Sequence, residues 1–218
     1  DVRTLGNHEF DKKMSGLGDM LALSSVPVVA SNYDFSSTSL ADYVGNSVIL
    51  EAGDVKVGFI GLNVRLENLV DPKACEGVVW QNAINVADDE AKKLRDQGAD
   101  MVIALSHLGY EKNSTLNYYD RGIVMNTRHI DMIIGGHSHT FLNYADYVTN
   151  LDGDKVPVVQ TGSKGICLGY AKIKISKEGR LSFNYKLIPV KSHLDSKLDR
   201  AFSDMIDAYS ATVSAKMD

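Results

Sequence analysis

The sequence predicts a mixed α/β fold in which two packed sheets are covered by helices on the outside. Strand-like and helix-like segments alternate over the first two thirds of the chain, which favours strands joined by crossover helices. The last third carries short strand-like segments separated by turn signals, which is typical of antiparallel hairpins. The 218 residues suffice for a sizeable core, as one large domain or two small ones.

The first sixty residues contain apolar segments with strand-like spacing and one with helical spacing. Residues 2–5 and 26–30 are short apolar strands, and residues 13–24 between them carry apolar side chains at helical spacing. Residues 47–51 and 56–62 flank the pair Gly53-Asp54, a sequence typical of a hairpin turn. A strand, a helix, a second strand and a hairpin therefore follow one another.

The clearest helix covers residues 83–97. Its apolar side chains form one face, and Gly98 stands where a helix-terminating glycine belongs. Residues 101–105 are an uninterrupted apolar run, which predicts a buried strand. A further helical stretch is expected within residues 116–126, before the apolar run that ends at Gly135.

The last third is predicted to be antiparallel. Turn signals at Asp152-Gly153-Asp154 and Lys177-Glu178-Gly179 separate its strand-like segments. The predicted strands cover residues 144–149, 157–160, 169–176 and 180–187. A largely polar helix with one apolar stripe is expected over residues 195–217.

Composition excludes several classes of protein. The formal charge of −5 and pI near 5.7, without a basic stripe, argue against non-specific binding to nucleic acid. A phosphorylated small substrate remains compatible, because a metal can supply local positive charge. No apolar run reaches the roughly 18–20 residues of a transmembrane helix. No signal peptide is visible, but this excludes nothing, because the chain is expected to lack the true N-terminus. Cys75 and Cys167 are interpreted as two separate buried thiols. The alternative, a single disulfide between them, is not excluded by their spacing.

Polar motifs follow three of the predicted strands, at the point where each strand ends. Because strand carboxyl ends converge on one edge of such a sheet, four of the six histidines are expected to share a site. Imidazole and amide groups are suitable ligands for a divalent metal. The motifs are Gly6-Asn7-His8-Glu9 followed by Asp11, Ser106-His107, and Gly136-His137-Ser138-His139.

Each motif has a plainer interpretation when it is taken alone. Asn7 after Gly6 is also typical of a simple turn, and a histidine such as His107 often just ends a strand. The pair His137 and His139 is more informative, because two preceding glycines let the backbone approach a ligand closely. The other two histidines, His129 and His193, lack such a setting and are predicted to lie at the surface.

The motifs together, in this order, resemble the calcineurin-like metallophosphoesterase superfamily. They are most similar to the bacterial 5′-nucleotidase family, which includes UDP-sugar hydrolases and 2′,3′-cyclic-nucleotide phosphodiesterases. The resemblance covers nearly the whole chain and implies a two-sheet αββα sandwich. It is carried by Leu5-Gly6-Asn7-His8-Glu9-Phe10-Asp11, Ser106-His107, Gly135-Gly136-His137-Ser138-His139 and Gln160-Thr161-Gly162.

The resemblance also implies roles for single residues. His8 would be the catalytic histidine near the scissile phosphate, held by Asp11. The chemistry implied is in-line attack on phosphorus by hydroxide between two metals about 4 Å apart. The metals would be two divalent ions in the complete parent protein, drawn from Zn, Mn, Fe or Co. Asn7, His107 and His137 would bind the second metal, and His139 the first.

The sequence departs from the family pattern in one respect. The family carries an Asp-x-His pair and a Gly-Asp pair upstream of the Gly-Asn-His motif, and neither stands before Gly6 here. The Gly-Asp pairs of this chain, at Gly18, Gly53 and Gly153, all come later. The resemblance therefore implies a fold without its first βα units. At most one metal is expected to bind this chain, which by itself is predicted to be inactive.

Two hypotheses follow: one concerns the complete parent protein and the other concerns this chain alone. The parent protein is interpreted as a two-metal phosphoesterase acting on nucleotides, whereas the chain alone is a partial domain whose histidine loops are inherited. Residues 1–194 are assigned to a catalytic domain that is incomplete at its N-terminus. Residues 195–218 are assigned to a helix leading toward an absent C-terminal substrate domain or separate subunit. The family's usual location is the periplasm or the cell exterior.

Overall fold

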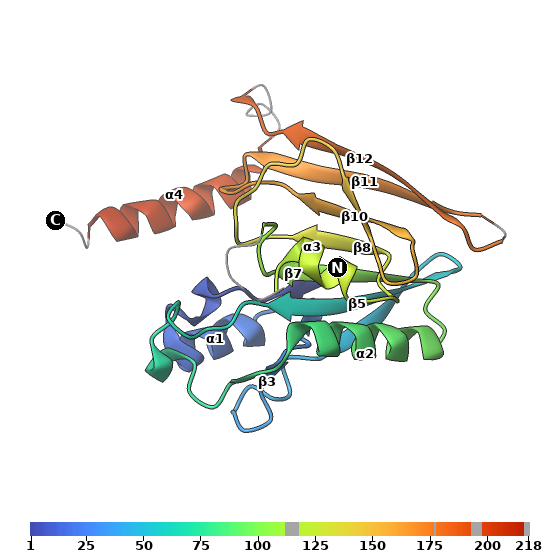
Figure 1. The fold of residues 1–218 in the computed structure, drawn as a ribbon. Helices are drawn as coiled ribbons and strands as arrows, with labels where there is room; N and C mark the ends of the chain where they lie inside the picture. Colours follow the sequence, from blue (N-terminus) through green and yellow to red (C-terminus); the bar gives the residue numbers. More distant parts are fainter. Residues whose placement is uncertain (112–117, 177, 193–197, 216–218) are drawn as a thin grey trace.

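The computed structural model describes residues 1–111, 118–176, 178–192 and 198–215. Its centre is a six-stranded mixed sheet (Figure 1), whose inner strands run parallel and whose two edge strands pair antiparallel. In spatial order the strands are β4 (Ser47–Ala52), β5 (Val55–Asn63), β7 (Met101–His107), β8 (Met132–Gly135), β10 (Lys155–Gln160) and β9 (Asp146–Thr149).

Two helices cover one face of this central sheet. Helix α2 (Ala83–Asp96) begins at Asn82, whose side chain accepts hydrogen bonds from two backbone N–H groups, and it ends before Gly98, which has φ +90°. Its buried side chains share one core with those of α3 (Asp120–Met125) and the sheet. The helix predicted over residues 83–97 is thus confirmed, and the spacing of its apolar residues placed this face correctly.

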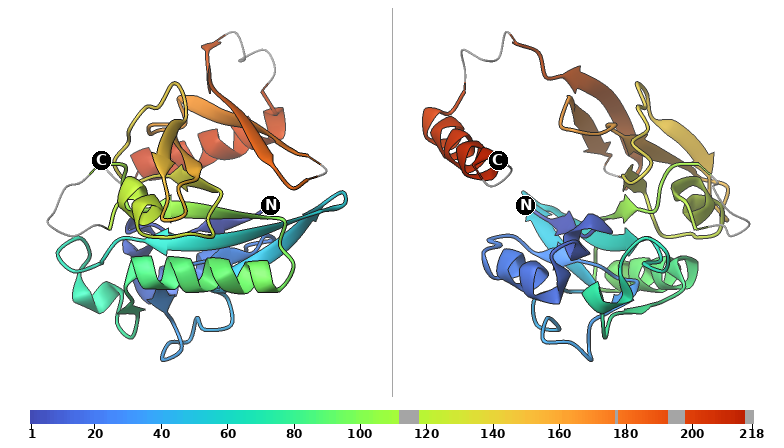
Figure 2. Two further views of the ribbon diagram at one scale, coloured as in Figure 1. Left: turned by 45° about the vertical axis from the view of Figure 1, so that its right-hand side comes forward. Right: turned by 90° about the vertical axis from the view of Figure 1, so that its left-hand side faces the viewer.

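An antiparallel pair of strands covers the other face. β11 (Cys167–Ile175) and β12 (Leu181–Pro189) lie over the central sheet (Figures 1 and 2). Their inner side chains, among them Phe183, pack against Met101, Ile103 and Met132. Alternate residues of β7 therefore enter two different cores, which explains why that strand is apolar without interruption. Two sheets with helices outside form the predicted α/β architecture.

The N-terminal segment forms a layer of its own. β1 (Arg3–Thr4) pairs in parallel with β2 (Val28–Val29), and the two are not part of the central sheet. The turn η1 (His8–Phe10) and helix α1 (Lys13–Ala22) follow β1. Their apolar side chains form a second core with β3 (Tyr33–Asp34), which pairs with β6 (Val79–Trp80), and a short turn η2 (Pro72–Ala74) lies nearby. The expectation that all three motifs end strands of one sheet is therefore wrong.

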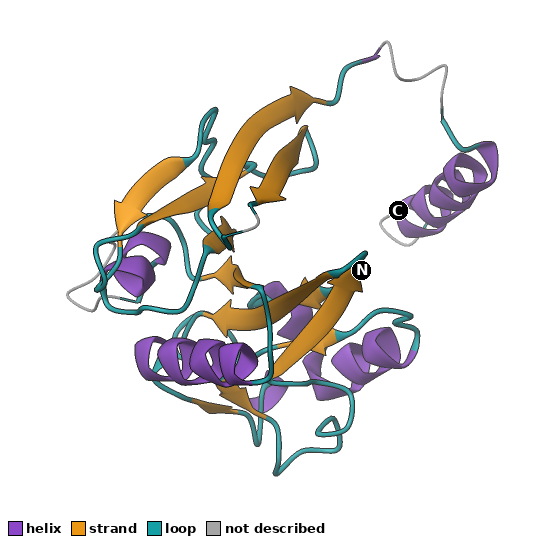
Figure 3. Ribbon diagram, turned by 90° about the vertical axis from the view of Figure 1, so that its right-hand side faces the viewer, coloured by secondary structure: helices purple, strands orange, loops and turns teal. Residues whose placement is uncertain are grey.

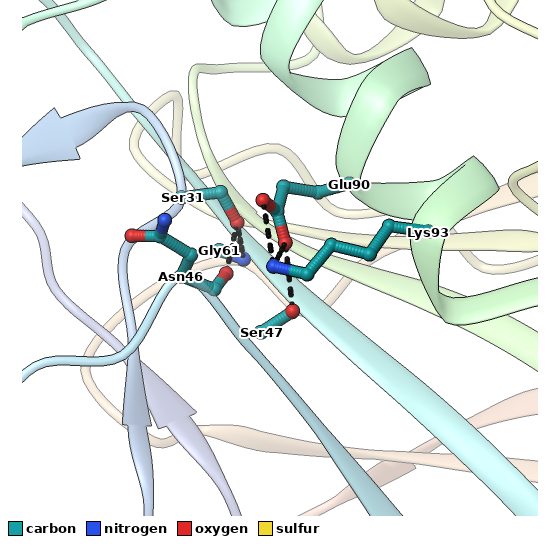
Figure 4. A network of polar contacts seen from close by, with 6 residues as sticks. All are labelled: Ser31, Asn46, Ser47, Gly61, Glu90 and Lys93. Carbon is teal, nitrogen blue, oxygen red and sulfur yellow. Dashed lines mark hydrogen bonds and ion pairs between the residues drawn. The ribbon is translucent and has the colours of Figure 1, made fainter. Parts of the chain in front are cut away.

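A close approach between backbones joins the N-terminal layer to the central sheet. A Cβ atom on Gly61 of β5 would lie 2.0 Å from the carbonyl oxygen of Val29, so only glycine fits there. Ser31, just after β2, accepts a hydrogen bond from Gly61 N and donates one to the carbonyl of Asn46 (Figure 4). In the same figure, Ser47 of β4 donates to Glu90 of α2. The N-terminal layer is thus held firmly against the central sheet.

The final helix stands apart from these layers. α4 (Arg200–Ser214) begins at Asp199, whose side chain accepts a hydrogen bond from Phe202 N. Among its described residues none is buried, and Figure 3 shows the helix away from both sheets. The helix predicted over residues 195–217 is confirmed for this span, and residues 195–197 and 216–217 lie outside the described part of the chain.

Two details of the last third differ from the prediction. β10 pairs antiparallel with β9 but parallel with β8, so this region is not entirely antiparallel. The reason is that β9 and β10 extend the central sheet as its edge hairpin, whereas β11 and β12 leave it for the second layer. Cys75 and Cys167 are both free and half-buried rather than fully buried.

Candidate metal centre

The first and second motifs meet although they belong to different layers. Asn7, which precedes η1, is buried, and its Oδ1 lies 3.2 Å from Nε2 of His107 at the end of β7. A buried asparagine, Asn63, explains the contact. Asn63 lies opposite His107 in the register of β5 and β7, and its side-chain amide donates to the carbonyl of Leu5. This hydrogen bond holds the segment before Gly6 beside the end of β7.

The third motif completes the cluster. The rings of His107 and His137 are in edge-to-face contact, with centroids 5.1 Å apart. Gly6 and Gly136 create the space for His107: a Cβ atom on Gly6 would lie 2.8 Å from the ring, and one on Gly136 would lie 3.2 Å from Nδ1. Glycine is therefore needed in the first and third motifs because a larger residue there would crowd the ring of His107 in the second motif.

The loop that follows β8 is held in an unusual conformation. His137 has φ +70° and His139 has φ +56°, in the left-handed region that side chains other than glycine seldom adopt. Such a conformation costs of the order of 1–3 kcal/mol for each residue and tends to occur at functional sites. This backbone conformation takes the two histidines out of strand geometry. The side chain of His137 is half-buried, and that of His139 is exposed.

The electrostatics of the cluster keep its inner histidines neutral. Burial lowers the pKa of His107 to about 4, with the charges of His137, His8 and His139 adding to the fall and Glu9 opposing it. Burial also lowers the pKa of His137, and the charges of His139 and His8 contribute. All four histidines therefore share one electrostatic environment. A neutral imidazole carries the free nitrogen lone pair that a metal ligand needs.

His8 lies at the exposed edge of the cluster and has its own partner. Its Nδ1 lies 3.0 Å from Oδ2 of Asp11, because the turn η1 brings the side chain three residues later back alongside it. The predicted pairing of His8 with Asp11 is thus confirmed. The neighbouring carboxylate of Glu9 does not pair with His8 and accepts a hydrogen bond from Gly6 N at 2.6 Å.

The donor set fits a divalent metal in part. Two ligands about 2.1 Å from one ion lie about 3.4 Å apart in tetrahedral coordination, close to the 3.2 Å that separates Asn7 Oδ1 from His107 Nε2. One amide oxygen and imidazole nitrogens suit the metals predicted from the sequence. However, the described ranges contain no group of three or more His, Cys, Asp or Glu side chains arranged to hold a metal. The residues present therefore match only part of the donor set that a metal needs.

Several polar residues behind the cluster were not predicted as site residues. Asn63, Asp120 and Gln160 are almost completely buried, and each bonds to a segment that carries a motif residue. A signal exists for two of them: Asn63 and Gln160 are polar residues at the ends of apolar strands, as His107 is. Asp120 has no such signal. Of the remaining histidines, His129 is half-buried rather than at the surface, and His193 lies outside the described residues.

Comparisons with known proteins agree on one family. The calcineurin-like phosphoesterase family matches residues 2–141 of the chain. Human 5′-nucleotidase is 30% identical over 198 residues, which cover 83% of this chain and 33% of that protein. An apyrase from Tabanus yao is 35% identical over 176 residues, covering 77% of this chain and 30% of the apyrase. The chain thus spans about a third of the length of these relatives.

A solved structure extends the likeness to the fold. The structure of a 5′-nucleotidase precursor from Thermus thermophilus superimposes with a TM-score of 0.86 at 25% sequence identity. The match covers the whole of this chain and 44% of that one. The likeness includes all the layers described above, from β1 to α4.

Proposed function

The chain belongs to the calcineurin-like phosphoesterase family, and we propose that its complete natural protein is a two-metal hydrolase of nucleotide phosphate esters. Phosphoester hydrolysis is the activity of the family, and the nucleotide follows from the 5′-nucleotidases and apyrase among the relatives. The observation that carries the proposal is the meeting of Asn7, His107 and His137 from three separate strand ends, with the His8–Asp11 pair beside them.

Four residues of this chain are proposed to hold the metals. Asn7, His107 and His137 would bind one ion, and His139 would contribute to the second, with Zn, Mn, Fe or Co fitting the mixed nitrogen and oxygen donors. The bound ions would supply Lewis-acid charge and an activated water. The chain's own contribution is to present neutral imidazoles from rigid strand ends, where Gly6 and Gly136 leave room for the rings.

His8 is proposed to act on the substrate itself. Its side chain is 81% exposed, so a phosphate group can reach it, while Asp11 fixes one ring nitrogen. The other nitrogen, Nε2, would then donate a hydrogen bond or a proton to the phosphate or the leaving oxygen. Stabilising charge as it develops on those oxygens is the role that such a donor fulfils.

The proposal is tested on the complete natural protein. After removal of metal with a chelator, the protein is expected to release phosphate from nucleoside monophosphates only when Mn²⁺ or Zn²⁺ is restored. Release of phosphate from the monophosphates is measured with a coupled colorimetric assay. Opening of a 2′,3′-cyclic nucleotide to the nucleoside monophosphate, which releases no phosphate, is followed by chromatography for comparison. Activity that survives complete removal of metal, or failure to hydrolyse any phosphate ester with metal restored, would contradict the proposed function.

In the same assay, the substitution His8→Asn is expected to lower kcat by about 10²-fold or more, which is typical of losing one general acid or base. Bound metal per chain should stay at the wild-type value, because His8 is proposed to contact the substrate and no metal. Elemental analysis measures the metal, and His129→Asn is the control, since His129 has no proposed part in the site. Loss of metal at unchanged turnover per bound ion would show that His8 is a ligand.

The second hypothesis concerns the 218-residue polypeptide by itself. We propose that it is catalytically incomplete and binds at most one metal, since its sequence contains no Asp-x-His pair. Its Gly-Asp pairs lie in α1 and in the turns at Gly53 and Gly153. Under this hypothesis the histidine loops keep their arrangement without the complete set of ligands.

The organisation of the complete protein is also a proposal. Residues 1–194 would belong to the catalytic domain, and residues 195–218, including α4, would connect it to a domain or subunit that recognises the nucleoside. The protein is proposed to act in the periplasm or outside the cell, since the Thermus relative is described as a precursor. None of the described helices is both long enough and apolar enough to cross a membrane.

A further inference from the structure

Two buried polar side chains lie beneath the histidine loops and take no part in the proposed chemistry. Asp120, the first residue of α3, is fully buried, and Gln160, the last residue of β10, is 1% exposed. Burying polar groups of this size is unfavourable unless hydrogen bonds compensate for the lost water. The hydrogen bonds that their side chains complete lead to the segments that carry His107, His137 and His139.

Asp120 holds the segment around His107. Ser106 Oγ donates to Oδ1 of Asp120 at 2.5 Å, and the backbone N–H of Asp120 donates to the carbonyl of Gly109 at 2.8 Å. Ser106 Oγ also accepts from Leu108 N at 3.2 Å. The residues on both sides of His107 are thus fixed to the start of α3.

Gln160 holds the loop that carries the other two histidines. Its Nε2 donates to the carbonyl of Gly136 at 3.0 Å, and its Oε1 accepts from Ser138 Oγ at 3.0 Å and from Thr140 N at 2.5 Å. These contacts lie before, between and after the two histidines with positive φ. A strained backbone persists only where its surroundings determine it so completely.

The two side chains meet beneath Gly135. A Cβ atom on Gly135 would lie 2.1 Å from Asp120 Oδ2 and 3.1 Å from Gln160 Nε2. Burial raises the pKa of the Asp120 carboxyl to about 7, and the side chains of Ser106 and Gln160 oppose that rise. Oδ2 of Asp120 completes no hydrogen bond within the described residues. One buried polar unit therefore joins the end of β7 to the loop after β8.

We propose that Asp120 and Gln160 are positioning residues that hold His107 and the loop 136–140 at the spacing a shared metal ion requires. The inference rests on the proposed metal site. Groups that orient metal ligands from behind typically contribute about 10- to 100-fold to metal affinity or activity. Gln160 is the more direct of the two, because its three hydrogen bonds end on the loop itself.

The test measures the dissociation constant for Zn²⁺ of the complete natural protein, by competition with a chromogenic chelator. Gln160→Met keeps the length of the side chain and removes its hydrogen bonds, so we expect affinity to fall by about 10- to 100-fold. Asn150→Leu is the matched control. Asn150 is also a buried amide with three hydrogen bonds, to Arg128, Asp152 and Asp154, but it holds the turn between β9 and β10 and bonds to none of the three motifs.

A second variant keeps the test decisive if Gln160→Met fails to fold. Ser138 is exposed, so Ser138→Ala spares the core. It removes the bond to Gln160 together with the bonds of Ser138 Oγ to Tyr110 N and Thr140 Oγ1. We expect affinity to fall at least 2- to 10-fold, which is about the effect of one net hydrogen bond. Wild-type affinity in both variants, or an equal loss in Asn150→Leu, would overturn the inference and leave the proposed function standing. A wild-type protein that binds no divalent metal would overturn both.

Discussion

Replacing His137 by alanine in the complete natural protein is expected to release bound metal and to lower kcat/KM for a nucleotide substrate by about 10³-fold. His137 is in contact with His107, and Gly136 lets its loop pass close to that ring. Losing a ligand removes transition-state stabilisation of several kcal/mol, and each 1.36 kcal/mol corresponds to a factor of about ten in rate.

The measurement combines initial-rate kinetics with elemental analysis of metal per chain. His129→Ala is the control, because His129 is a half-buried histidine with no proposed part in the cluster. The thermal unfolding midpoint of the metal-free protein should change little, since the His137 side chain is only half-buried. If His137→Ala keeps its full metal content and its rate, the metal site has been assigned to the wrong residues.

The polypeptide of these 218 residues alone is expected to show negligible phosphatase activity, even with added Mn²⁺ or Zn²⁺. Its donors amount to Asn7, His107 and His137 for one ion and His139 for another, whereas about four ligands are needed at each. Two nearby metal ions without a carboxylate between them would also repel each other strongly. At most one ion per chain is expected to bind, through His107, His137 and Asn7.

The assay is hydrolysis of a chromogenic phosphate ester by the purified polypeptide, with its termini verified by mass spectrometry. Metal stoichiometry is measured by titration, with His107→Ala as the control that should abolish binding of the single ion. The complete natural protein, assayed at equal concentration, provides the positive reference. Robust metal-dependent turnover by the 218 residues would mean that other side chains complete the site.

Secondary structure was predictable where one local signal dominated. The hairpin around Gly53 and helix α2 match the expected positions closely, because a turn glycine and an amphipathic repeat act over a few neighbouring residues. The sheet to which β9 and β10 belong was not predictable in the same way. Whether a strand such as β10 runs parallel or antiparallel to its neighbours depends on which strands lie beside it, and β8 is distant in sequence.

The sequence by itself determined the motif residues, since a polar group at the end of a buried apolar strand is visible without any structure. It also determined the His8–Asp11 pair, because one helical turn joins residues three apart. Only the tertiary structure decided that Asn7 reaches His107 from a different sheet, through Asn63 and the close approach at Gly61. The roles of Asp120 and Gln160 were also visible only in the structure, because a buried polar residue acquires its role from the partners that folding brings to it.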